Sequence, residues 1–337
     1  MSTADLIYPP PNLPPASALR LSQSAPRILS SSTTSSLPWP LSLLTSRETQ
    51  ETWASHENLL LSCLRTGDDK SARQCLDRLT ARFGQDNQRV VALRFLYESA
   101  VAEDKDLRRI LEDLELVLKE DPTSLPLRKR KVALLRSMGR TAEAITALVD
   151  LVDFSPTDAE SWAELSDLYL GQSMCSQAIF SLEEVLVITP FAWNVHARMG
   201  ELLYILATAA NTTDGNVLRN LSDGIRRFCR SIELCDNYLR GYYGLKLVQL
   251  TYASKKTAKK LLELLPKTSN KQAVTDTAGD IAPPSIATVE KLHELATAKL
   301  AEIVRRSGSG EAGWDYDQSE LIAARELLDR DTQAVPK

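Results

Sequence analysis

A regular interval between prolines constrains this chain more than any other feature of its sequence. Pro122, Pro156 and Pro190 are evenly spaced, and an amphipathic helical pattern precedes each of them. A proline ends a helix because it has no N–H to donate and disfavours the α conformation in the residue before it. The interval therefore predicts repeated helix-turn-helix units, which stack because no single unit can bury its apolar face alone.

The residues between the prolines repeat as well. Ala144 and Ala178 hold equivalent places, and so do Leu148 and Leu182. Small residues at the alanine position let the two helices of a unit approach closely. A period of about 34 residues with these offsets is typical of the tetratricopeptide repeat. We predict an all-α fold, a tetratricopeptide-repeat α-solenoid that forms a right-handed superhelix of about five helix-turn-helix units.

The period also predicts where the repeats begin and end. Regular units span residues 91–124, 125–158 and 159–192, and a divergent unit, offset by four residues, spans 53–86. The unit at 159–192 matches the repeat consensus best, because large residues on its first helix face small ones on its second.

The next helix pair departs from the regular phase. It starts near Trp193, has Gly200 at the small position of its first helix, and carries Phe228 on a second helix that comes later than the period predicts. We interpret the polar stretch Asn211–Asn220 as a longer connection that explains this displacement. Gly244 holds the small position of the helix that follows.

Composition divides the chain into three parts. Residues 1–46 are rich in proline and serine, show little apolar periodicity, and are expected to form a disordered tail whose removal over 1–40 leaves the fold intact. A transit peptide is the weaker alternative for this tail. Residues 47–252 form the repeat array, and 253–337 form C-terminal helices with a linker at about 267–284.

Two helices are expected in the C-terminal part, at Ser285–Arg306 and Ser319–Asp329. The lysines of segment 255–260 recur at helical spacing beside leucines. A solvated basic face is the first interpretation of this segment. Contact with anionic lipid head groups or an acidic partner is the alternative.

The overall composition excludes some classes of protein. A net charge of −4 and a pI near 5.6 give no basic signature, so we expect no nucleic-acid partner. The N-terminus lacks the pattern of a secretory signal, and no run approaches the roughly 20 apolar residues that span a bilayer. We therefore expect a soluble chain on the cytosolic side. The 5 cysteines form no CxxC pair and are interpreted as small buried hydrophobic residues.

The sequence contains no recognisable catalytic or metal-binding pattern. The 3 histidines, His56, His196 and His293, have no acid or cysteine at the spacing of a metal ligand set or a triad. The glycines form no phosphate-binding loop. We expect no enzyme activity, no cofactor and no metal.

A surface for binding remains as the functional candidate. In this architecture the first helix of each unit lines a concave groove, and its register predicts which side chains face a ligand. These candidate partner-binding residues are Lys129, Arg136, Glu160, Asp167, Asn194, Glu201 and Tyr204. A hydrated face without a partner is the alternative for any one of them.

Two further expectations concern the basic residues of this groove. In the run Arg128–Lys131, four adjacent cations spread around a helix, so we expect Lys129 alone to face the groove. Lys129 and Arg198 could fill two places of the carboxylate clamp of chaperone-binding tetratricopeptide domains. Ala133 and Glu164 occupy other places of that clamp and disfavour a chaperone-tail adaptor.

Part of the chain resembles a known family. The stretches LEDLELVLKEDPTSLPLRKRKVALLRSMGRTAEAI, DAESWAELSDLYL and QAIFSLEEVLVITP, followed by LRGYYGLKL, resemble subunit 2 of the endoplasmic reticulum membrane protein complex. The combination of KEDPT, RKRK and WAELSDLY is more specific than the repeat consensus. The resemblance covers residues 80–250, approximately.

The resemblance implies a role that composition and periodicity do not. It implies a non-catalytic scaffold subunit, peripheral on the cytoplasmic side of the endoplasmic reticulum membrane. Its partners would be membrane-embedded and soluble subunits of the complex, which inserts tail-anchored and multipass membrane proteins. The chain would associate with the membrane through these partners. The alternative is a free cytosolic tetratricopeptide adaptor that binds peptide segments of partner proteins.

Overall fold

Every regular element that the structure describes is an α-helix. The computed structural model describes residues 7, 13–31, 50–209, 214–253, 284–311, 314 and 316–334. The chain divides into two compact units, unit 1 (Met1–Ser155) and unit 2 (Pro156–Lys337).

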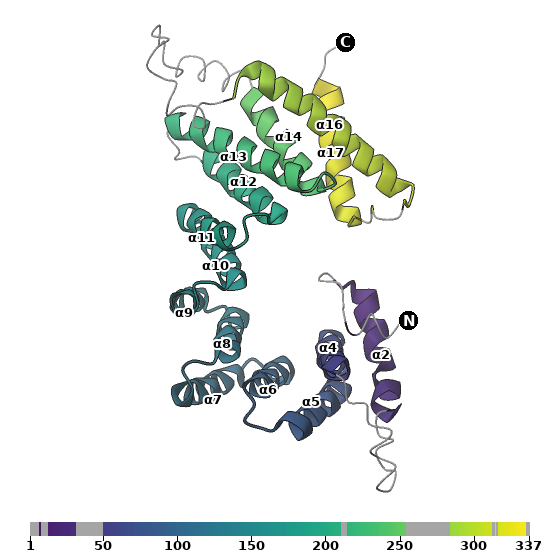
Figure 1. Cartoon of the computed structure of the whole chain (residues 1–337), viewed down its shortest axis with the longest axis vertical. Coiled ribbons are helices and arrows are strands. Elements are labelled where there is room, and N and C mark those ends of the chain that lie inside the picture. Colours follow the sequence, from purple (N-terminus) through teal and green to yellow (C-terminus); the bar gives the residue numbers. More distant parts are fainter. Residues whose placement is uncertain are drawn as a thin grey trace. The chain divides into compact units, whose positions relative to one another are not determined.

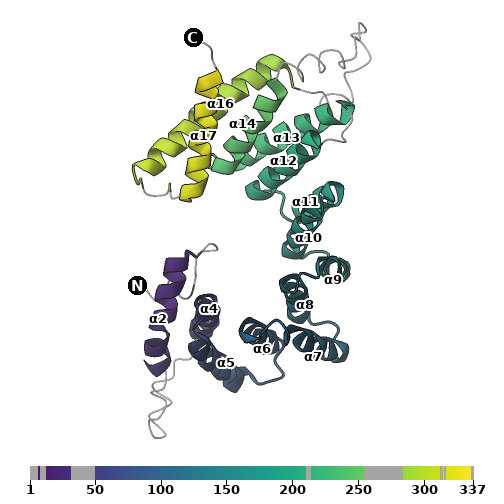
Figure 2. The ribbon, with the colours of Figure 1, turned by 180° about the vertical axis from the view of Figure 1, so that it is seen from behind.

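Unit 1 is a row of helices in chain order. Its helices are α2 (Pro15–Ser31), α4 (Gln50–Thr66), α5 (Asp69–Phe83), α6 (Gln88–Val101), α7 (Leu107–Glu120), α8 (Leu125–Ser137) and α9 (Thr141–Phe154). From α4 to α9 each helix packs on the next, and α6 also contacts α8 (Figure 1). Helix α2 lies against α4 and α5, and the view from behind shows it in the same place (Figure 2).

Unit 2 continues the same construction and adds longer helices. Its helices are α10 (Ala159–Gly171), α11 (Cys175–Ile188), α12 (Trp193–Thr208), α13 (Asp214–Leu234), α14 (Leu239–Ala253), α16 (Ile286–Gly308) and α17 (Gln318–Ala334). From α10 to α14 each helix packs on the next, α16 packs on α14, and α17 packs on α16.

The predicted all-α tetratricopeptide fold is confirmed in the described residues. The pairs α6/α7, α8/α9 and α10/α11 occupy the predicted units, and α4/α5 forms the predicted divergent one. Pro122, Pro156 and Pro190 each lie two residues beyond the end of a second helix. Helix ends that fall at the same phase of the repeat explain why the prolines were the clearest signal in the sequence.

The backbone at these helix ends repeats as closely as the sequence. In each case the N–H of the residue before the proline donates to the carbonyl four residues back: Asp121 to Val117 at 3.0 Å, Ser155 to Leu151 at 2.8 Å and Thr189 to Val185 at 2.8 Å. These bonds satisfy carbonyls of the last turn that would otherwise lack a donor. Each second helix therefore ends in the same geometry.

A side-chain hydrogen bond then closes each turn between repeats. The donors, each one repeat after the last, bind the carbonyls of the repeat-closing prolines: Arg128 Nε to Pro122 at 2.7 Å, Trp162 Nε1 to Pro156 at 2.9 Å and His196 Nε2 to Pro190 at 3.1 Å. The three donors differ in chemistry but share the place and the acceptor. Because each donor belongs to the next first helix, the bond fixes where that helix starts relative to the turn.

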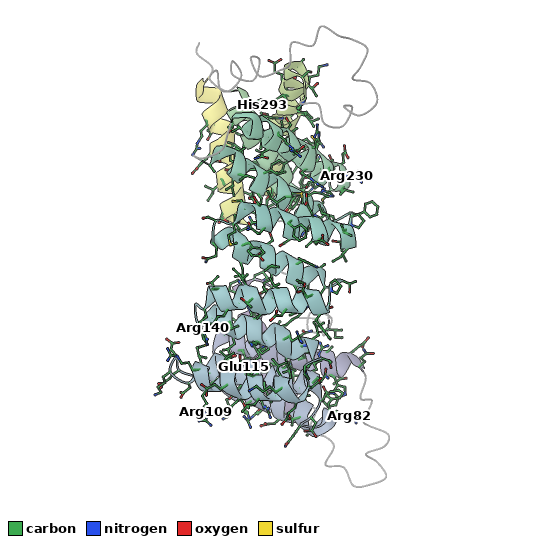
Figure 3. All side chains as sticks on the ribbon, turned by 90° about the vertical axis from the view of Figure 1, so that its left-hand side faces the viewer. Arg82, Arg109, Glu115, Arg140, Arg230 and His293 are labelled. Atoms are coloured by element: carbon green, nitrogen blue, oxygen red, sulfur yellow. The ribbon has the colours of Figure 1, made fainter. Side chains whose placement is uncertain are left out.

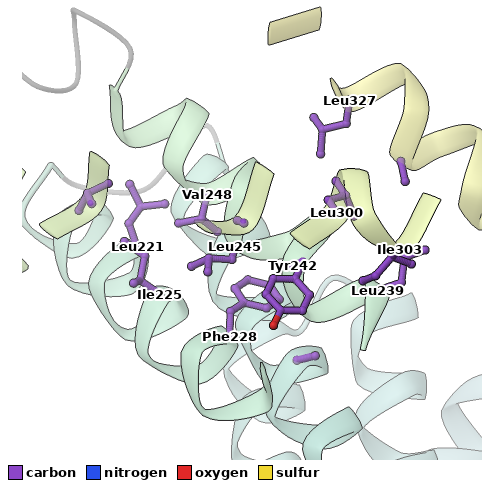
Figure 4. Packing of buried hydrophobic residues seen from close by; sticks show 14 of the residues in the cluster. Leu221, Ile225, Phe228, Leu239, Tyr242, Leu245, Val248, Leu300, Ile303 and Leu327 are labelled. Carbon is purple, nitrogen blue, oxygen red and sulfur yellow. The ribbon is translucent and has the colours of Figure 1, made fainter. Parts of the chain in front are cut away.

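The core of unit 2 is built around Phe228. Its ring lies against Gly200 of α12 and Gly244 of α14, the two small positions predicted from the sequence. Figure 4 shows the ring beside Tyr242, with leucines of α14 and α16 around them. The core continues into α17 through Leu327.

A polar network joins α14 to α16. The Tyr242 hydroxyl donates to Asp236 Oδ1 at 2.9 Å, and Lys299 Nζ donates to Asp236 Oδ2 at 3.0 Å. These hydrogen bonds, that of Lys299 first, lower the pKa of the Asp236 carboxyl below its ordinary value. The buried Lys246 Nζ also donates to Thr297 Oγ1, at 2.7 Å.

The prediction that residues 1–46 form a disordered tail is wrong for Pro15–Ser31, which form α2. Leu21, Ala25 and Leu29 recur at helical spacing and are buried against α4 and α5. Serine hydroxyls bond back to carbonyls of their own helix; Ser24 Oγ, for example, donates to Leu21 at 2.6 Å. The high serine and proline content concealed this apolar stripe. Most of the remaining tail lies outside the described residues.

The interpretation of Asn211–Asn220 as a connection is also wrong for most of its length. Helix α13 begins at Asp214, so the inserted residues extend the helix. Val217 packs against the core four residues before the buried Leu221, which continues the apolar face of the helix by a turn. Two adjacent apolar residues, Val217 and Leu218, among polar ones gave too weak a periodic signal to be recognised as helix.

The two C-terminal helices are confirmed. Ser285 caps α16 by accepting a hydrogen bond from the Thr288 N–H, and α17 covers the second predicted helix. Both helices share the core of unit 2, so the predicted boundary at 252/253 does not separate two cores among the described residues. Segment 255–260 and most of the linker at 267–284 lie outside the described residues.

The cysteines are free thiols at buried or half-buried places. Burial raises the pKa of the Cys63 thiol to about 12 and that of Cys75 to about 11. Because a thiol must lose its proton to act as a nucleophile or metal ligand, this environment suits a hydrophobic role. The prediction of buried cysteines holds fully for Cys63 and Cys75, whereas Cys175, Cys229 and Cys235 are half-buried.

Candidate functional site

The first helices of unit 1 line a cleft. Its volume is about 620 Å³, and its walls come from α4, α6 and α8. The lining residues are Glu57, Asn87, Gln88, Arg89, Ala92, Leu93, Pro126, Lys129 and Arg130. Tetratricopeptide architecture places the groove on these helices, so the cleft is the candidate functional site of unit 1.

An ion pair across two helices forms one wall of the cleft. The guanidinium of Arg89 on α6 binds the Glu57 carboxylate on α4 in a forked arrangement, with Nε–Oε2 and Nη2–Oε1 distances of 2.9 Å each. Such paired bonds fix both groups in orientation as well as position. The pair neutralises the charge of Glu57. The basic side chains of α8 therefore give the cleft a net positive charge.

The basic run on α8 distributes its side chains in different directions. Arg128 closes the turn at Pro122, and Lys131 Nζ binds Glu115 Oε1 at 2.8 Å, away from the cleft. Glu115 lies near Arg140 at the surface of unit 1 (Figure 3). Lys129 lines the cleft, as the register predicted, but Arg130 lines it too. The expectation that Lys129 alone faces the groove is therefore corrected.

Arg130 occupies an unusual environment in the cleft. Its Nε is buried and has no hydrogen-bond partner among the described residues. Burial lowers the pKa of its guanidinium. Arg136 lies seven residues after Lys129 on the same stripe of α8, is exposed, and is not part of the cleft lining. The cleft thus offers a desolvated cation as well as an accessible one.

In unit 2 a three-residue ion-pair chain joins the first helices α10 and α12. Arg198 binds Asp167 Oδ1 at 3.1 Å and Glu201 Oε2 at 2.6 Å. Burial alone would lower the pKa of Arg198, but the hydrogen bonds and charges of the two acids outweigh it and the pKa is raised. Asp167 and Glu201, both predicted from register, therefore share one surface.

The other predicted residues of unit 2 lie on the same two helices with different exposures. Glu160 and Asn194 are exposed near the starts of α10 and α12. Tyr204 is half-buried, and its hydroxyl lies 3.1 Å from Thr251 Oγ1 of α14. Tyr204 thus joins two first helices and has part of its ring at the surface.

The histidines that the structure places in unit 1 and at the start of α12 hold local backbone. No group of three or more histidine, cysteine and acidic side chains among the described residues could hold a metal ion. His56 Nδ1 lies 2.7 Å from the Thr52 carbonyl, and His196 Nε2 binds that of Pro190. Since a carbonyl can only accept, these ring nitrogens carry the hydrogen and hold local backbone.

Sequence reasoning missed Glu57 and Arg89, and it identified Arg198 as a possible clamp residue but not its contact with Asp167. Glu57 and Arg89 meet only because α4 packs near α6, and Arg198 meets Asp167 only because α10 lies near α12. No short-range spacing encodes these contacts. Glu201, three residues after Arg198 on one helix, was the one available signal, because opposite charges at that spacing face each other.

Comparison with known proteins identifies the family. Residues 80–213 match the model of the EMC2 TPR-like repeat domain. The TPR repeat protein oca3 of Schizosaccharomyces pombe is 34% identical over 250 residues, which are 74% of this chain and 82% of that protein. ER membrane protein complex subunit 2-B of Xenopus laevis is 29% identical over 206 residues, or 60% of this chain and 64% of the frog protein. The chain belongs to the family of ER membrane protein complex subunit 2. A further member, from Saccharomyces cerevisiae, is 26% identical over 220 residues, or 61% of this chain and 75% of the yeast protein.

The family match covers most of the helices that carry the candidate sites. The matched segment of the EMC2 family includes α6, α8, α10 and α12, whereas α4, which supplies Glu57, precedes it. Among the described residues, no helix is both long enough and apolar enough to cross a bilayer.

Proposed function

We propose that this chain is a non-catalytic scaffold subunit of the endoplasmic reticulum membrane protein complex. It acts on the cytosolic face of the membrane, as a peripheral subunit, and supports insertion of tail-anchored and multipass membrane proteins by binding other subunits. The observation that carries this proposal is the basic cleft on the first helices of unit 1, in a chain of this family.

The chemistry of the cleft indicates what it holds. Arg130 is half-buried, and its buried Nε has no partner among the described residues, which is costly for a charged group. An acidic or carbonyl-rich segment of another subunit provides acceptors for this guanidinium, and Lys129 adds a second cation beside it. A cytosolic segment of a membrane-embedded subunit with this composition fits the cleft.

The surface of unit 2 suits a different kind of contact. Asp167, Arg198 and Glu201 already satisfy one another, so a partner gains little by displacing them. Glu160 and Asn194 are exposed, so the polar groups of a partner can reach them. We assign this surface to docking of a further subunit through a polar interface, with no role for nucleic acid.

The competing function is a free cytosolic adaptor that captures short peptides. Ala133 and Glu164 stand where a chaperone-tail clamp requires polar or basic donors, which disfavours the best-known adaptor chemistry. The two functions differ in what accompanies the chain through purification.

Affinity purification tests the proposal. The chain is tagged at its C-terminus, membranes are solubilised in mild detergent, and co-purifying proteins are quantified by mass spectrometry. We expect a stoichiometric set of membrane-embedded and soluble subunits of the complex. Recovery from the cytosolic fraction alone, or with chaperones only, would reject the scaffold function in favour of the adaptor.

A further inference from the structure

Unit 2 contains a cavity as well, which is formed mainly by the second helices of its repeats. It has a volume of about 420 Å³, with walls from α11 and α13 and a floor from α12. Ile179 and Glu183 come from α11, and the buried Met199 and Leu203 come from α12. It is separate from the residues predicted as the groove, and the function proposed above does not use it.

Arginines dominate the α13 wall of this cavity. Arg226 binds Asp223 at 2.6 Å, and Arg230 binds Glu233 at 3.1 Å. Arg227 lines the cavity between them and has no ion pair among the described residues. Arg230 reaches the surface of unit 2 (Figure 3). The α13 wall therefore has one unneutralised cation at its centre.

The floor of the cavity contains an unsatisfied hydrogen-bond acceptor. His196 is only 6% exposed, and its Nε2 donates to the Pro190 carbonyl. Burial, with the nearby charges of Arg227 and Arg230, lowers the pKa of its imidazole, so the ring is neutral and Nδ1 carries no hydrogen. Nδ1 has no donor among the described residues. Nδ1 is itself buried, so His196 contributes its ring to the cavity floor but no accessible acceptor.

Large apolar side chains of α11 and of the turn after it are exposed. Phe180 and Val187 of α11 flank Glu183 on one face of the helix and are 54% and 76% exposed. Phe191, just after α11, is 68% exposed. Phe180 also packs edge-on against Trp162 of α10. Exposed apolar side chains of this size are typical of a protein-binding surface.

We propose that the pocket between α11, α12 and α13 binds a partner peptide that carries an acidic side chain next to an apolar one. The carboxylate binds Arg227 and Arg230, and the apolar side chain covers Ile179, Met199 and Leu203. A subunit of a complex and a free adaptor could both use such a pocket, so this inference does not depend on the function proposed above.

Two observations favour a peptide over a phosphate or a lipid head group. An inorganic anion brings no apolar group to cover the floor of the cavity. Glu183, on the wall opposite the arginines, would repel a doubly charged phosphate more than a single carboxylate. A peptide with an acidic and an apolar side chain matches the arginines and the apolar floor together.

Fluorescence anisotropy with the full-length chain tests the pocket. The probe is a fluorescein-labelled amphipathic helical peptide of leucine and glutamate, and the matched probe has glutamine in place of each glutamate. We expect the acidic probe to bind and Arg227→Gln to weaken its binding about tenfold, the size of one charge-assisted hydrogen bond. The glutamine probe should bind the wild-type chain no more tightly than the acidic probe binds Arg227→Gln.

Arg305→Gln is the matched control, because it removes the same charge from α16 outside the pocket lining. It should leave the affinity unchanged, and unchanged thermal melts should show that both variants fold. No binding of the acidic probe, equal binding of the glutamine probe, or equal loss in both variants would overturn the proposal. So would displacement of the probe by inorganic phosphate at an ionic strength where chloride does not displace it.

Discussion

Gly244 illustrates how little space the core of unit 2 leaves around one residue. A Cβ at this position would lie 2.2 Å from Cε1 of Phe228, against 2.8 Å from Cε2 for one at Gly200. Both distances are far below ordinary contact, and Phe228 is itself buried on all sides. The two glycines are therefore required by the ring, although neither has an unusual backbone conformation.

We predict that Gly244→Ala destabilises unit 2 by about 1–3 kcal/mol through overpacking. A loss of stability would be informative, because in an unstrained helix alanine is favoured over glycine by about 1 kcal/mol. The free energy of unfolding in urea measures the effect. Gly171→Ala is the matched control, since its Cβ would meet nothing within 4 Å, and it should be neutral or stabilising. Equal stability of the two variants would contradict this packing.

Ser173 carries local backbone strain. Its φ is 60°, whereas Gly139, one repeat earlier, serves the same turn at φ 72°. A side chain in this left-handed region costs about 1–2 kcal/mol, and glycine avoids that cost. We predict that Ser173→Gly raises the melting temperature, while the reverse change, Gly139→Ser, lowers it. A lower melting temperature for Ser173→Gly would show that the serine side chain contributes more than the strain costs.

His196 makes stability depend on pH. Its pKa is lowered in the folded chain, first by burial and also by Arg227 and Arg230, while the unfolded value is about 6.5. Below about pH 6.5 the unfolded chain therefore binds more protons, and stability falls as pH decreases toward the folded pKa. When the pH is lowered from neutral to mildly acidic, we predict that the melting temperature of His196→Gln falls less than that of the wild type. Parallel curves for the two proteins would exclude this residue as a cause.

At the scale of elements, α2 contributes to the stability of unit 1. Leu21 and Leu29 are buried with Leu59 and Leu60 of α4, and the Arg78 guanidinium donates to the Leu29 carbonyl at the end of α2. Removal of residues 1–40 would expose this apolar surface, so the structure contradicts the expectation that such a deletion leaves the fold unaffected.

We predict that Leu21→Ala lowers the free energy of unfolding by about 2–3 kcal/mol, within the usual range for a buried leucine. Leu19, two residues earlier on the same helix, is 47% exposed and provides the control. Leu19→Ala should change stability by less than about 0.5 kcal/mol. Denaturation monitored by circular dichroism distinguishes the two variants. If both behave alike, α2 does not pack as described.

The repeated helices were predictable because each one satisfies several local signals together. Apolar spacing, small residues such as Ala144 and Ala178, and a closing proline all indicate the same helix pair. The local signals in α2 disagree. Its serine and proline content indicates disorder, whereas its short apolar stripe indicates a helix. Its helical state depends on packing against α4 and α5, and a tertiary contact of this kind leaves little trace in local sequence.

The candidate sites were predictable only in part, for a related reason. Register on first helices identified Lys129, Asp167 and Glu201, because helical periodicity fixes which face a residue occupies. Arg130 was missed although it lies four residues after Pro126 and so shares the face of α8 that lines the cleft. The donors that close the turns were missed as a set, since an arginine, a tryptophan and a histidine share no type and only their common acceptor reveals them.

At the scale of the whole molecule, stacked helix pairs in each unit bring side chains of neighbouring helices together on shared surfaces. Unit 1 offers a basic cleft on its first helices, and unit 2 offers a neutralised charged surface and a separate arginine-walled pocket. No described feature requires chemistry at any of them. The central claim is that the cleft holds an acidic segment of a partner subunit in the endoplasmic reticulum membrane protein complex.

Charge reversal in the cleft tests this claim most directly. Tagged Lys129→Glu is purified from detergent-solubilised membranes beside tagged Lys119→Glu, which makes the same change at an exposed place on α7 outside the cleft. Co-purifying subunits are quantified by mass spectrometry, with thermal melts as the folding check. We predict that Lys129→Glu loses membrane-embedded subunits while Lys119→Glu retains them. Full recovery of the subunits with both variants would contradict the role of the cleft.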